Sequence, residues 1–417
     1  MESQINKVRS RKKNSTFTIN GINYGRVIAA QTYDNSFSSI IKEAIRLFLF
    51  DYKIEITDKT DSNIGLFYAL KSSNRNDYDY IVNKFQDIVE NVRRIDLIRY
   101  KSINKVFFKI LKLIKNFNKL RKYNIQDIMI SSIVITQYEI LNEDIEKSKI
   151  FDDLELVCTF CDAHGCDNLI TQIAKNKEIK TATLQHGQYR ILSEGKEVAD
   201  AEAYENFISD YMLTWGQATI DQFKKVGIED SRFKKVGALK SFSFNNKIIN
   251  KEKNNVFGVV LSGEYYRNTN IEMIKLANLI ASKYNMSYYI RLHPRNNASF
   301  YEKYCNMEYL VDMVSNIENE DYANIVDFSI LHMTGVFVEL LSINSPIIIF
   351  KDELLENIFD IENYCISNII DFGTVYDNFK NNYMIFLNEQ YKLYRYFNED
   401  GDVTSNYKLA IENIINN

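Results

Sequence analysis

The chain has 417 residues, and its 51 basic and 55 acidic side chains give a formal net charge of −4. That length predicts two domains, and 46% hydrophobic with 25% charged residues is typical of a folded globular chain, not a disordered one. The slightly acidic balance argues against general nucleic-acid binding, which needs a strongly basic surface.

The N-terminal sequence, MESQINKVRSRKKNSTF, is polar and basic and lacks the apolar core of a secretory signal. No window reaches the roughly 18 uninterrupted apolar residues of a membrane span. Five cysteines in a chain of this length do not form a disulfide framework. We therefore expect a cytoplasmic protein with free thiols.

Short β-rich runs alternate with helical stretches in the first half of the chain. The pattern predicts strands at residues 63–70, 154–160, 180–184 and 211–215, and helices at 77–92, 167–175 and 218–226. Gly227 follows the last of these helices and suits a left-handed C-cap. This alternation favours an α/β fold with parallel sheets.

One segment of the first half, residues 97–126, contains no acidic residue. Within it we expect a basic amphipathic helix near residues 99–122. Its apolar residues recur at helical spacing and are Ile103, Val106, Phe107, Ile110, Leu111, Ile114, Phe117 and Leu120. Two interpretations stay open: the apolar stripe packs on its own domain, which is the default, or it lies on an anionic bilayer.

A polar stretch at residues 241–255, SFSFNNKIINKEKNN, marks the expected domain boundary. After it the alternation restarts, with expected strands at 256–261, 287–292, 328–331 and 346–350 and helices at 271–284 and 336–341. We therefore expect two Rossmann-like α/β domains facing a cleft, over residues 1–245 and 254–380, followed by a helical segment over 381–417. In such sheets ligands bind outside the carboxyl ends of the strands.

Each of the four histidines follows a predicted strand; they are His164, His186, His293 and His332. His186 lies in the run Gln185-His186-Gly187, which puts an imidazole at a sheet edge beside a backbone that a ligand can approach. Imidazole is suited to proton transfer near neutral pH, so His186 is a candidate base. The alternative is a hydrogen-bonded structural histidine. Asp162, close to His164, is a second candidate base.

Cationic side chains gather where another predicted strand ends, in the run Arg291-Leu292-His293-Pro294-Arg295. Two arginines and a histidine in five residues suit a phosphate, and the alternative is a strand end with solvated arginines. Two small turns, Thr334-Gly335 and Ser262-Gly263, offer backbone N–H groups to an anion. Glu339, one turn into the next helix, could accept hydrogen bonds from a ribose, although an ordinary N-cap turn explains this spacing equally well.

Seven short motifs occur in a fixed order: Gln185-His186-Gly187, Thr214-Trp215-Gly216, Gly227-Ile228, Val236-Gly237, Arg291-Leu292-His293-Pro294, Thr334-Gly335 with Glu339, and Ser345-Pro346. In this order the chain, from Leu154 to Phe350, resembles GT-B glycosyltransferases of bacterial surface-polysaccharide synthesis. It looks like the capsule and teichoic-acid group, which includes CDP-glycerol glycerophosphotransferases and transferases that use CMP-activated acidic sugars.

The resemblance implies an enzyme whose first domain holds the acceptor and a catalytic base, while its second domain holds a nucleotide donor. It places His186 at the base position near the acceptor, and to the acceptor side we add His164, Gln185 and Gly187. The donor-side positions that it implies are Arg291, His293, Thr334, Gly335 and Glu339, to which we add Ser262 and Gly263. Relatives often carry paired serines where this chain has His332-Met333-Thr334-Gly335, which leaves the donor open.

Two sequence segments resemble metal-binding motifs. Cys158, Cys161, His164 and Cys166 have the residue types of a zinc site, but Cys158 lies inside a predicted apolar strand, so we favour buried free thiols. The pair of acids in Asp77-Tyr78-Asp79 resembles the metal-binding motif of GT-A transferases, but its place at a predicted helix start favours capping. No P-loop or GxGxxG motif is present. We expect no metal and no cofactor.

The candidate residues and the resemblance together predict a glycosyltransferase or glycerophosphotransferase. It would move a sugar or polyol-phosphate from a nucleotide-activated donor of the CDP, CMP or UDP type to an oligosaccharide or lipid-linked acceptor of a bacterial surface glycan. Two alternatives stay open: a non-catalytic nucleotide- or glycan-binding component of a synthesis complex, and a sugar-nucleotide epimerase. We expect no nucleic-acid partner, and a peripheral position on the inner face of the plasma membrane if the basic helix binds anionic lipid.

Overall fold

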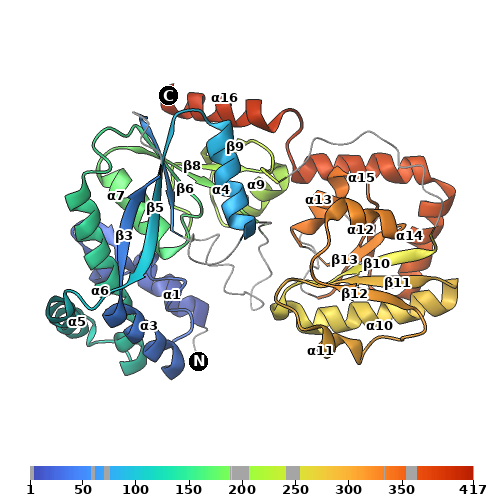
Figure 1. The fold of residues 1–417 in the computed structure, drawn as a ribbon, viewed down its shortest axis with the longest axis horizontal. Coiled ribbons are helices and arrows are strands. Elements are labelled where there is room, and N and C mark those ends of the chain that lie inside the picture. Colours follow the sequence, from blue (N-terminus) through green and yellow to red (C-terminus); the bar gives the residue numbers. More distant parts are fainter. Residues whose placement is uncertain are drawn as a thin grey trace. The chain divides into compact units, whose positions relative to one another are not determined.

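The computed structural model describes residues 4–57, 62–69, 76–187, 189, 206–240, 254–332, 334–353 and 364–416. The chain forms two compact units (Figure 1). The first contains Met1–Trp215, Ile220–Leu239 and Val403–Asn417, and the second contains Gly216–Thr219 and Lys240–Asp402. Each unit is built around a largely or wholly parallel sheet, so the expected class of two Rossmann-like α/β domains is confirmed.

The first unit is built on a seven-stranded sheet. Its strands are β3 (Phe50–Ile56), β4 (Ile64–Tyr68), β5 (Val92–Lys101), β6 (Leu156–Thr159), β7 (Lys180–Leu184), β8 (Tyr211–Thr214) and β9 (Phe233–Lys235). They lie in the order β3-β5-β4-β6-β7-β8-β9, and only β3 and β5 pair antiparallel. A separate short ladder pairs β1 (Thr18–Ile19) with β2 (Ile22–Asn23).

Helices cover both faces of this sheet, because successive side chains of a strand point to opposite faces. On β4, Phe67 enters a core shared with α3, α6 and α7, whereas Leu66 and Tyr68 enter a core shared with α4 and α16. The helices are α1 (Gln4–Lys13), α2 (Tyr24–Val27), α3 (Phe37–Leu49), α4 (Asn76–Ile88), α5 (Val106–Leu120), α6 (Ile125–Ser148), α7 (Gly165–Asn176), α9 (Gln217–Lys224) and α16 (Val403–Asn416).

The last helix, α16, belongs to the first unit, where it lies beside α4 (Figure 1). Tyr407 of α16 packs its ring on Phe85 of α4 at 5.8 Å, and Lys408 pairs with Glu90. The segment expected over residues 381–417 is therefore divided, since the chain up to Asp402 stays with the second unit. The reason is that the apolar face of β4, β6 and β7 needs a cover, which α4 and α16 supply together.

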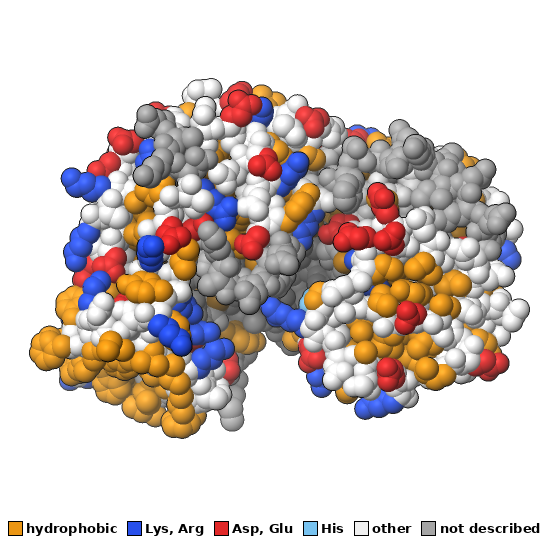
Figure 2. Space-filling model, viewed as in Figure 1, with side chains coloured by type: hydrophobic (Ala, Val, Ile, Leu, Met, Phe, Trp, Pro, Cys, Tyr) orange, Lys and Arg blue, Asp and Glu red, His pale blue; other side chains and the backbone are white. Residues whose placement is uncertain are grey.

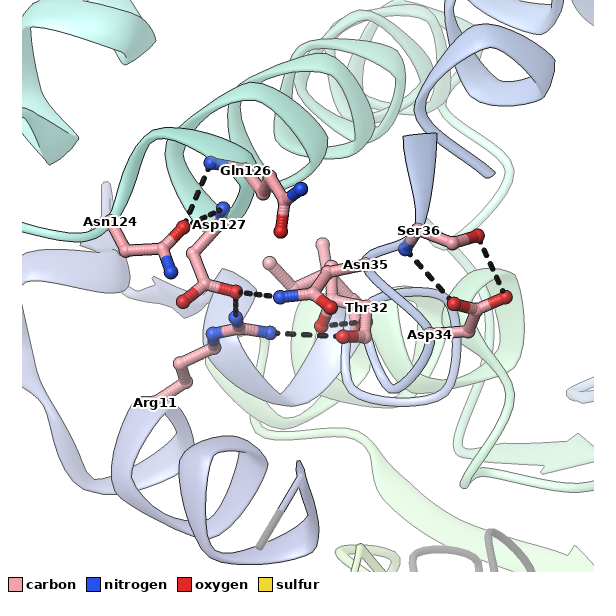
Figure 3. A network of polar contacts seen from close by, with 9 residues as sticks. Arg11, Thr32, Asp34, Asn35, Ser36, Asn124, Gln126 and Asp127 are labelled. Atoms are coloured by element: carbon pink, nitrogen blue, oxygen red, sulfur yellow. Dashed lines mark hydrogen bonds and ion pairs between the residues drawn. The ribbon is translucent and has the colours of Figure 1, made fainter. Parts of the chain in front are cut away.

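A buried polar network ties the N-terminal helix to α6 (Figure 3). Arg11 of α1 pairs with Asp127 of α6 at 2.6 Å, and the same carboxylate oxygen accepts a hydrogen bond from Asn35 at 2.7 Å. Arg11 also donates to the backbone oxygen of Thr32 at 3.2 Å. Asn124 caps α6 by accepting hydrogen bonds from two backbone N–H groups. The N-terminal residues, for which the sequence suggested no role, are thus part of the first unit.

The second unit is built on a six-stranded, wholly parallel sheet. Its strands are β10 (Val256–Val260), β11 (Ser287–Arg291), β12 (Leu310–Val314), β13 (Ser329–Leu331), β14 (Ile347–Phe350) and β15 (Cys365–Ile366), in the order β12-β11-β10-β13-β14-β15. Its helices are α10 (Arg267–Tyr284), α11 (Ala298–Glu302), α12 (Asn319–Ile325), α13 (Val336–Ser342), α14 (Ile369–Asn381) and α15 (Tyr383–Phe397). Gln390 of α15 bonds both the N–H and the oxygen of Ile347, which anchors α15 at the start of β14.

The structure moves several of the expected boundaries. The expected basic helix begins at Val106, because residues 99–101 are still part of β5, where they pair with β3. The helix expected over 77–92 ends at Ile88, and Val92 starts β5. Gly227 has a φ of +79°, as its C-cap position predicts. The polar stretch at 241–253 lies outside the described residues, and none of the described helices is long and apolar enough to cross a membrane.

Candidate functional site

The first unit brings its candidate residues to one edge of its sheet. Strands β6, β7 and β8 are parallel neighbours, so the residues that follow them meet at the carboxyl edge. Gln185, His186 and Gly187 follow β7, Asp162 and His164 follow β6, and Trp215 follows β8. The rings of His164 and His186 lie 5.8 Å apart.

Gln185 is buried and braces this edge. Its Oε1 accepts a hydrogen bond from the backbone N–H of Trp215 at 2.8 Å, while its Nε2 donates to the oxygen of Gly187 at 2.9 Å. The indole N–H of Trp215 donates to the backbone oxygen of Gln185 at 3.0 Å. Because all of these polar groups are engaged within the protein, Gln185 positions the loop that carries His186.

Aromatic rings surround His186. Phe160, Tyr78 and Tyr189 lie 4.9, 5.7 and 6.1 Å from its ring, centroid to centroid. The neighbouring glycine leaves room, since a Cβ added at Gly187 would meet no atom within 4 Å. The edge therefore combines an imidazole in a largely aromatic setting with an open approach along the backbone.

Three side chains at this edge could hold a metal ion. The ligand atoms of Cys161, His164 and His186 all lie within 4.8 Å of one another. Burial lowers the pKa of His164, which favours its neutral ring, and burial raises the pKa of the Cys161 thiol. A protonated thiol is a weak ligand until a metal displaces its proton.

The remaining cysteines of the zinc-like run lie elsewhere. Cys158 faces the core shared with α4 and α16, whereas Cys166 faces the opposite core beside Tyr52 and Tyr138. Both are free thiols. The run of Cys158, Cys161, His164 and Cys166 is thus not one cluster, because a strand and the start of a helix direct its members to opposite faces of the sheet.

Asp162 has structural partners. Its side chain is buried, and one carboxylate oxygen accepts backbone hydrogen bonds from Ile208 at 2.9 Å and Ser209 at 2.7 Å. Burial raises the pKa of Asp162, and these two N–H groups oppose that shift. The carboxylate thus holds the segment that leads into β8, which gives this candidate base a structural role.

The second unit gathers its candidates in the same way, at the carboxyl ends of β10, β11 and β13. A Cβ added at Gly263 would lie 3.8 Å from the His293 ring, so these two loops are in contact. The Nδ1 atom of His293 accepts the backbone N–H of Arg295 at 3.2 Å, which leaves Nε2 to carry the proton of the neutral ring. Asn270 holds the loop by bonding the N–H and the oxygen of Ser262, at 2.9 and 2.8 Å.

A chain of polar side chains links Arg291 to Glu339. The Arg291 guanidinium donates to Asn319 Oδ1 at 2.5 Å, and Asn319 Nδ2 donates to the Glu339 carboxylate at 2.6 Å. Arg291 also lies over the ring of Tyr322, 5.4 Å from its centroid. Burial lowers the pKa of Arg291, while Tyr322 and Glu339 oppose the shift, and an arginine stays charged throughout.

The turn after β13 differs from a simple anion site. His332 is fully buried, with Nε2 3.2 Å from Asp352 and its ring packed on Tyr266. The Thr334 hydroxyl accepts the N–H of Val336 at 3.1 Å, while the N-cap of α13, a helix of only seven residues, is Gly335. Met333 lies outside the described residues. Thr334 and Gly335 are placed at the same sheet edge as Arg291, but the Thr334 hydroxyl already accepts a hydrogen bond within this turn.

Sequence reasoning missed several residues that hold these edges, namely Asn270, Asn319 and Tyr322, and it named Trp215 only as part of a motif. Trp215 is the one tryptophan of the chain, and a buried tryptophan N–H usually finds a partner, so its role in holding this edge could have been expected. Asn270 and Asn319 are two of many asparagines. Nothing in the local sequence distinguishes them, because their roles arise from contacts between distant segments.

No model of a protein family matches the chain, and no curated protein sequence matches it. Solved structures of similar fold include the S. aureus MnaA–UDP co-structure, with 10% identity over 85% of this chain and 98% of that one, at a TM-score of 0.49. UDP-GlcNAc 2-epimerase from Neisseria meningitidis, bound to UDP-GlcNAc, has 12% identity over 85% and 100% of the two chains, at 0.48.

The crystal structure of TarM has 12% identity over 68% of this chain, at a TM-score of 0.47, and the chain spans 60% of the TarM length. At such identities and scores these likenesses carry no information on donor, acceptor or reaction.

Proposed function

We propose that this protein is a glycosyltransferase or glycerophosphotransferase that uses a nucleotide-activated donor. The observation that carries the proposal is His186 at the end of β7, among aromatic rings and beside the open backbone of Gly187. Such an imidazole can take a proton from an incoming hydroxyl. The order of motifs, which resembles that of GT-B transferases, supports the same reading.

The proposed reaction uses the two sheet edges for different tasks. An acceptor hydroxyl forms a bond to the transferred sugar or polyol-phosphate, and its proton passes to His186. The bond between the donor group and the nucleotide breaks, and negative charge develops on the departing phosphate. Arg291 and the protonated nitrogen of His293 stabilise that charge. Asn319 and Glu339 fix the orientation of Arg291.

The classes of donor and acceptor that we propose rest on the resemblance of the sequence motifs. We propose a donor of the CDP, CMP or UDP type, and an oligosaccharide or lipid-linked acceptor of a bacterial surface glycan, such as a capsule or a teichoic acid. Glu339 remains the candidate for a ribose hydroxyl, in which case it would exchange its bond from Asn319 for one from the donor. The proposed location is the cytoplasmic side of the membrane.

A donor panel tests this proposal. The purified protein is incubated with CDP-glycerol and with CMP-, UDP- and GDP-activated sugars, with and without a lipid-linked oligosaccharide, and the products are identified by mass spectrometry. We expect nucleotide release that requires the acceptor, together with an acceptor whose mass has grown by one transferred group. Donor conversion without acceptor would instead identify an epimerase, and binding without turnover would identify a binding component.

A further inference from the structure

Helix α5 directs two polar side chains inward. Lys109 is fully buried and pairs with Asp51 at 2.9 Å, beneath the helix. Two helical turns further on, Asn116 is also buried, and its side-chain amide donates to Glu139 at 2.7 Å and to Thr136 at 3.1 Å. These partners engage the Lys109 ammonium and the Asn116 amide N–H groups that α5 directs inward, so this orientation of the helix is specific.

The opposite side of α5 and the loop before it are apolar and exposed. The exposed residues here are Ile103, Val106, Phe107, Phe108, Ile110, Leu111, Ile114 and Phe117. The default expectation, that this stripe packs on its own domain, is therefore wrong for most of its members. Only Leu120 of the expected stripe is buried, because Lys109 and Asn116 occupy the inward positions.

Helix α3 adds a second exposed apolar row, made of Phe37, Ile41, Ile45 and Leu49. These residues recur every four positions and share one side of the helix. Helices α3 and α5 contact each other, and both pack on α6. Figure 2 shows a continuous hydrophobic area at the lower left of the molecule, over these two helices. We call the twelve exposed apolar residues of α3 and of 103–117 the apolar platform.

A contiguous apolar surface such as the apolar platform marks a site of interaction with a protein or a membrane. The charges around the platform indicate what that is. Lys42, Lys101, Lys115, Lys119, Arg121 and Lys122 are exposed on or beside the two helices. The sequence from 97 to 126 contains no acid, and the one acid of α3, Glu43, is buried beside Arg46.

Apolar side chains surrounded by lysines match the interface of an anionic bilayer, which takes up the apolar groups and attracts the cations. A second copy of the chain is a poorer match. In a two-fold dimer the same basic surface would face itself, and like charges would meet across the interface.

We propose that α3 and α5 together form a docking surface for an anionic lipid bilayer. This proposal rests on the proposed function in one respect: docking would bring the enzyme to a lipid-linked acceptor. Docking itself requires no turnover, so the two proposals can fail separately.

Vesicle flotation tests the docking surface with the full chain. Vesicles of phosphatidylcholine alone are compared with vesicles that also contain phosphatidylglycerol, at low and high salt. We expect binding to the anionic vesicles at low salt, weaker binding at high salt, and little binding to the neutral vesicles. Equal binding to both kinds of vesicle, or no binding to the anionic ones, would overturn the proposal.

Two variants separate the apolar and the charged contributions. Ile103→Asn with Phe107→Asn should weaken vesicle binding by about tenfold or more, since each side chain loses a buried apolar contact with lipid. Ile103 and Phe107 are each 74% exposed, and Ile370 in the second unit is 76% exposed, so Ile370→Asn is a matched control that should bind like the wild type. Lys115→Gln should weaken binding by about fivefold and reduce the salt dependence.

Activity on a water-soluble acceptor should be unchanged in all of these variants, which keeps the test independent of the proposed reaction. Analytical ultracentrifugation of the same proteins tests whether a second copy of the chain occupies the apolar platform instead. A wild-type dimer that Ile103→Asn with Phe107→Asn converts to a monomer would assign the platform to a contact between copies and refute the bilayer.

Discussion

The carboxyl edges of the two sheets share a topology but differ in chemistry. At the first edge His186 lies among aromatic rings, and the polar groups nearby, Gln185 and Asp162, are engaged in holding the loops. At the second edge Arg291 is held by a chain of polar side chains that ends at Glu339. Strand order therefore decides where a candidate site lies, while the side chains after each strand decide whether that site suits proton transfer or anion binding.

The largest effect is expected from the first edge. His186→Ala should lower kcat by about 10²- to 10⁴-fold, because that is the usual contribution of a positioned base. Donor affinity, measured by calorimetry, should change little, since the donor is assigned to the other edge. A variant that folds like the wild type by circular dichroism and keeps a near wild-type kcat would remove His186 from the mechanism.

The cluster of Cys161, His164 and His186 allows a second test of the chemistry assigned to the first edge. If His186 is a base, we expect purified wild-type protein to contain much less than one zinc per chain by elemental analysis, even after incubation with zinc and removal of the excess. Stoichiometric zinc that is lost in Cys161→Ser would make His186 a ligand instead, and the first edge a metal site.

At the second edge, Arg291→Ala should raise the donor Kd by about 10- to 100-fold, because hydrogen bonds to charged groups contribute about 1.5–3 kcal/mol. Arg291→Lys should recover only part of this affinity, since an ammonium cannot form the paired hydrogen bonds of a guanidinium. Arg295→Ala tests the second arginine of this run, and we expect a smaller rise in the donor Kd, because the Arg295 side chain is exposed and only its backbone bonds His293. An unchanged Kd in Arg291→Ala would separate the donor from this edge.

Asn319 is a positioning residue, so its effect should be smaller. Asn319→Ala should raise the KM for the donor by several-fold and leave kcat nearly unchanged. The double variant with Arg291→Ala should be no worse than Arg291→Ala alone, because both substitutions remove one interaction. Additive effects in this double-mutant cycle would show that Asn319 acts independently of Arg291.

The last effect concerns stability and not activity, at a buried carboxyl group beneath the first edge. Burial raises the pKa of Asp167 to about 8, whereas an unfolded aspartate titrates near about 3.9. The folded state therefore binds the proton more tightly, and this stabilisation is full at low pH and is lost as the pH rises from about 4 to about 8.

Asp167→Asn removes this titration while keeping an oxygen that can accept the N–H of Cys161. Urea unfolding across this pH range should show wild-type stability falling relative to the variant, by up to about 1.4 kcal/mol per pH unit for one proton. A difference that does not vary with pH would mean that Asp167 is ionised throughout in the folded state.

Local pattern predicted the strands that carry both edges. The short apolar runs at 154–160, 180–184 and 287–292 became β6, β7 and β11, and the histidines that follow them lie at carboxyl ends. Pattern failed where the outcome depended on distant partners. The stripe of α5 was expected inside, but Lys109 finds Asp51 and Asn116 finds Glu139, which turns the apolar side outward.

Hydrophobic periodicity within a short window is enough to predict the α/β class, the alternation of elements and the residues that stand at the strand ends. Tertiary contacts were needed to show that α16 returns to the first unit, that Cys161 and not Cys158 lies with the histidines, and that Asn319 joins Arg291 to Glu339. These depend on which distant segments a sheet brings together, and contacts of that kind leave no periodic trace in the chain.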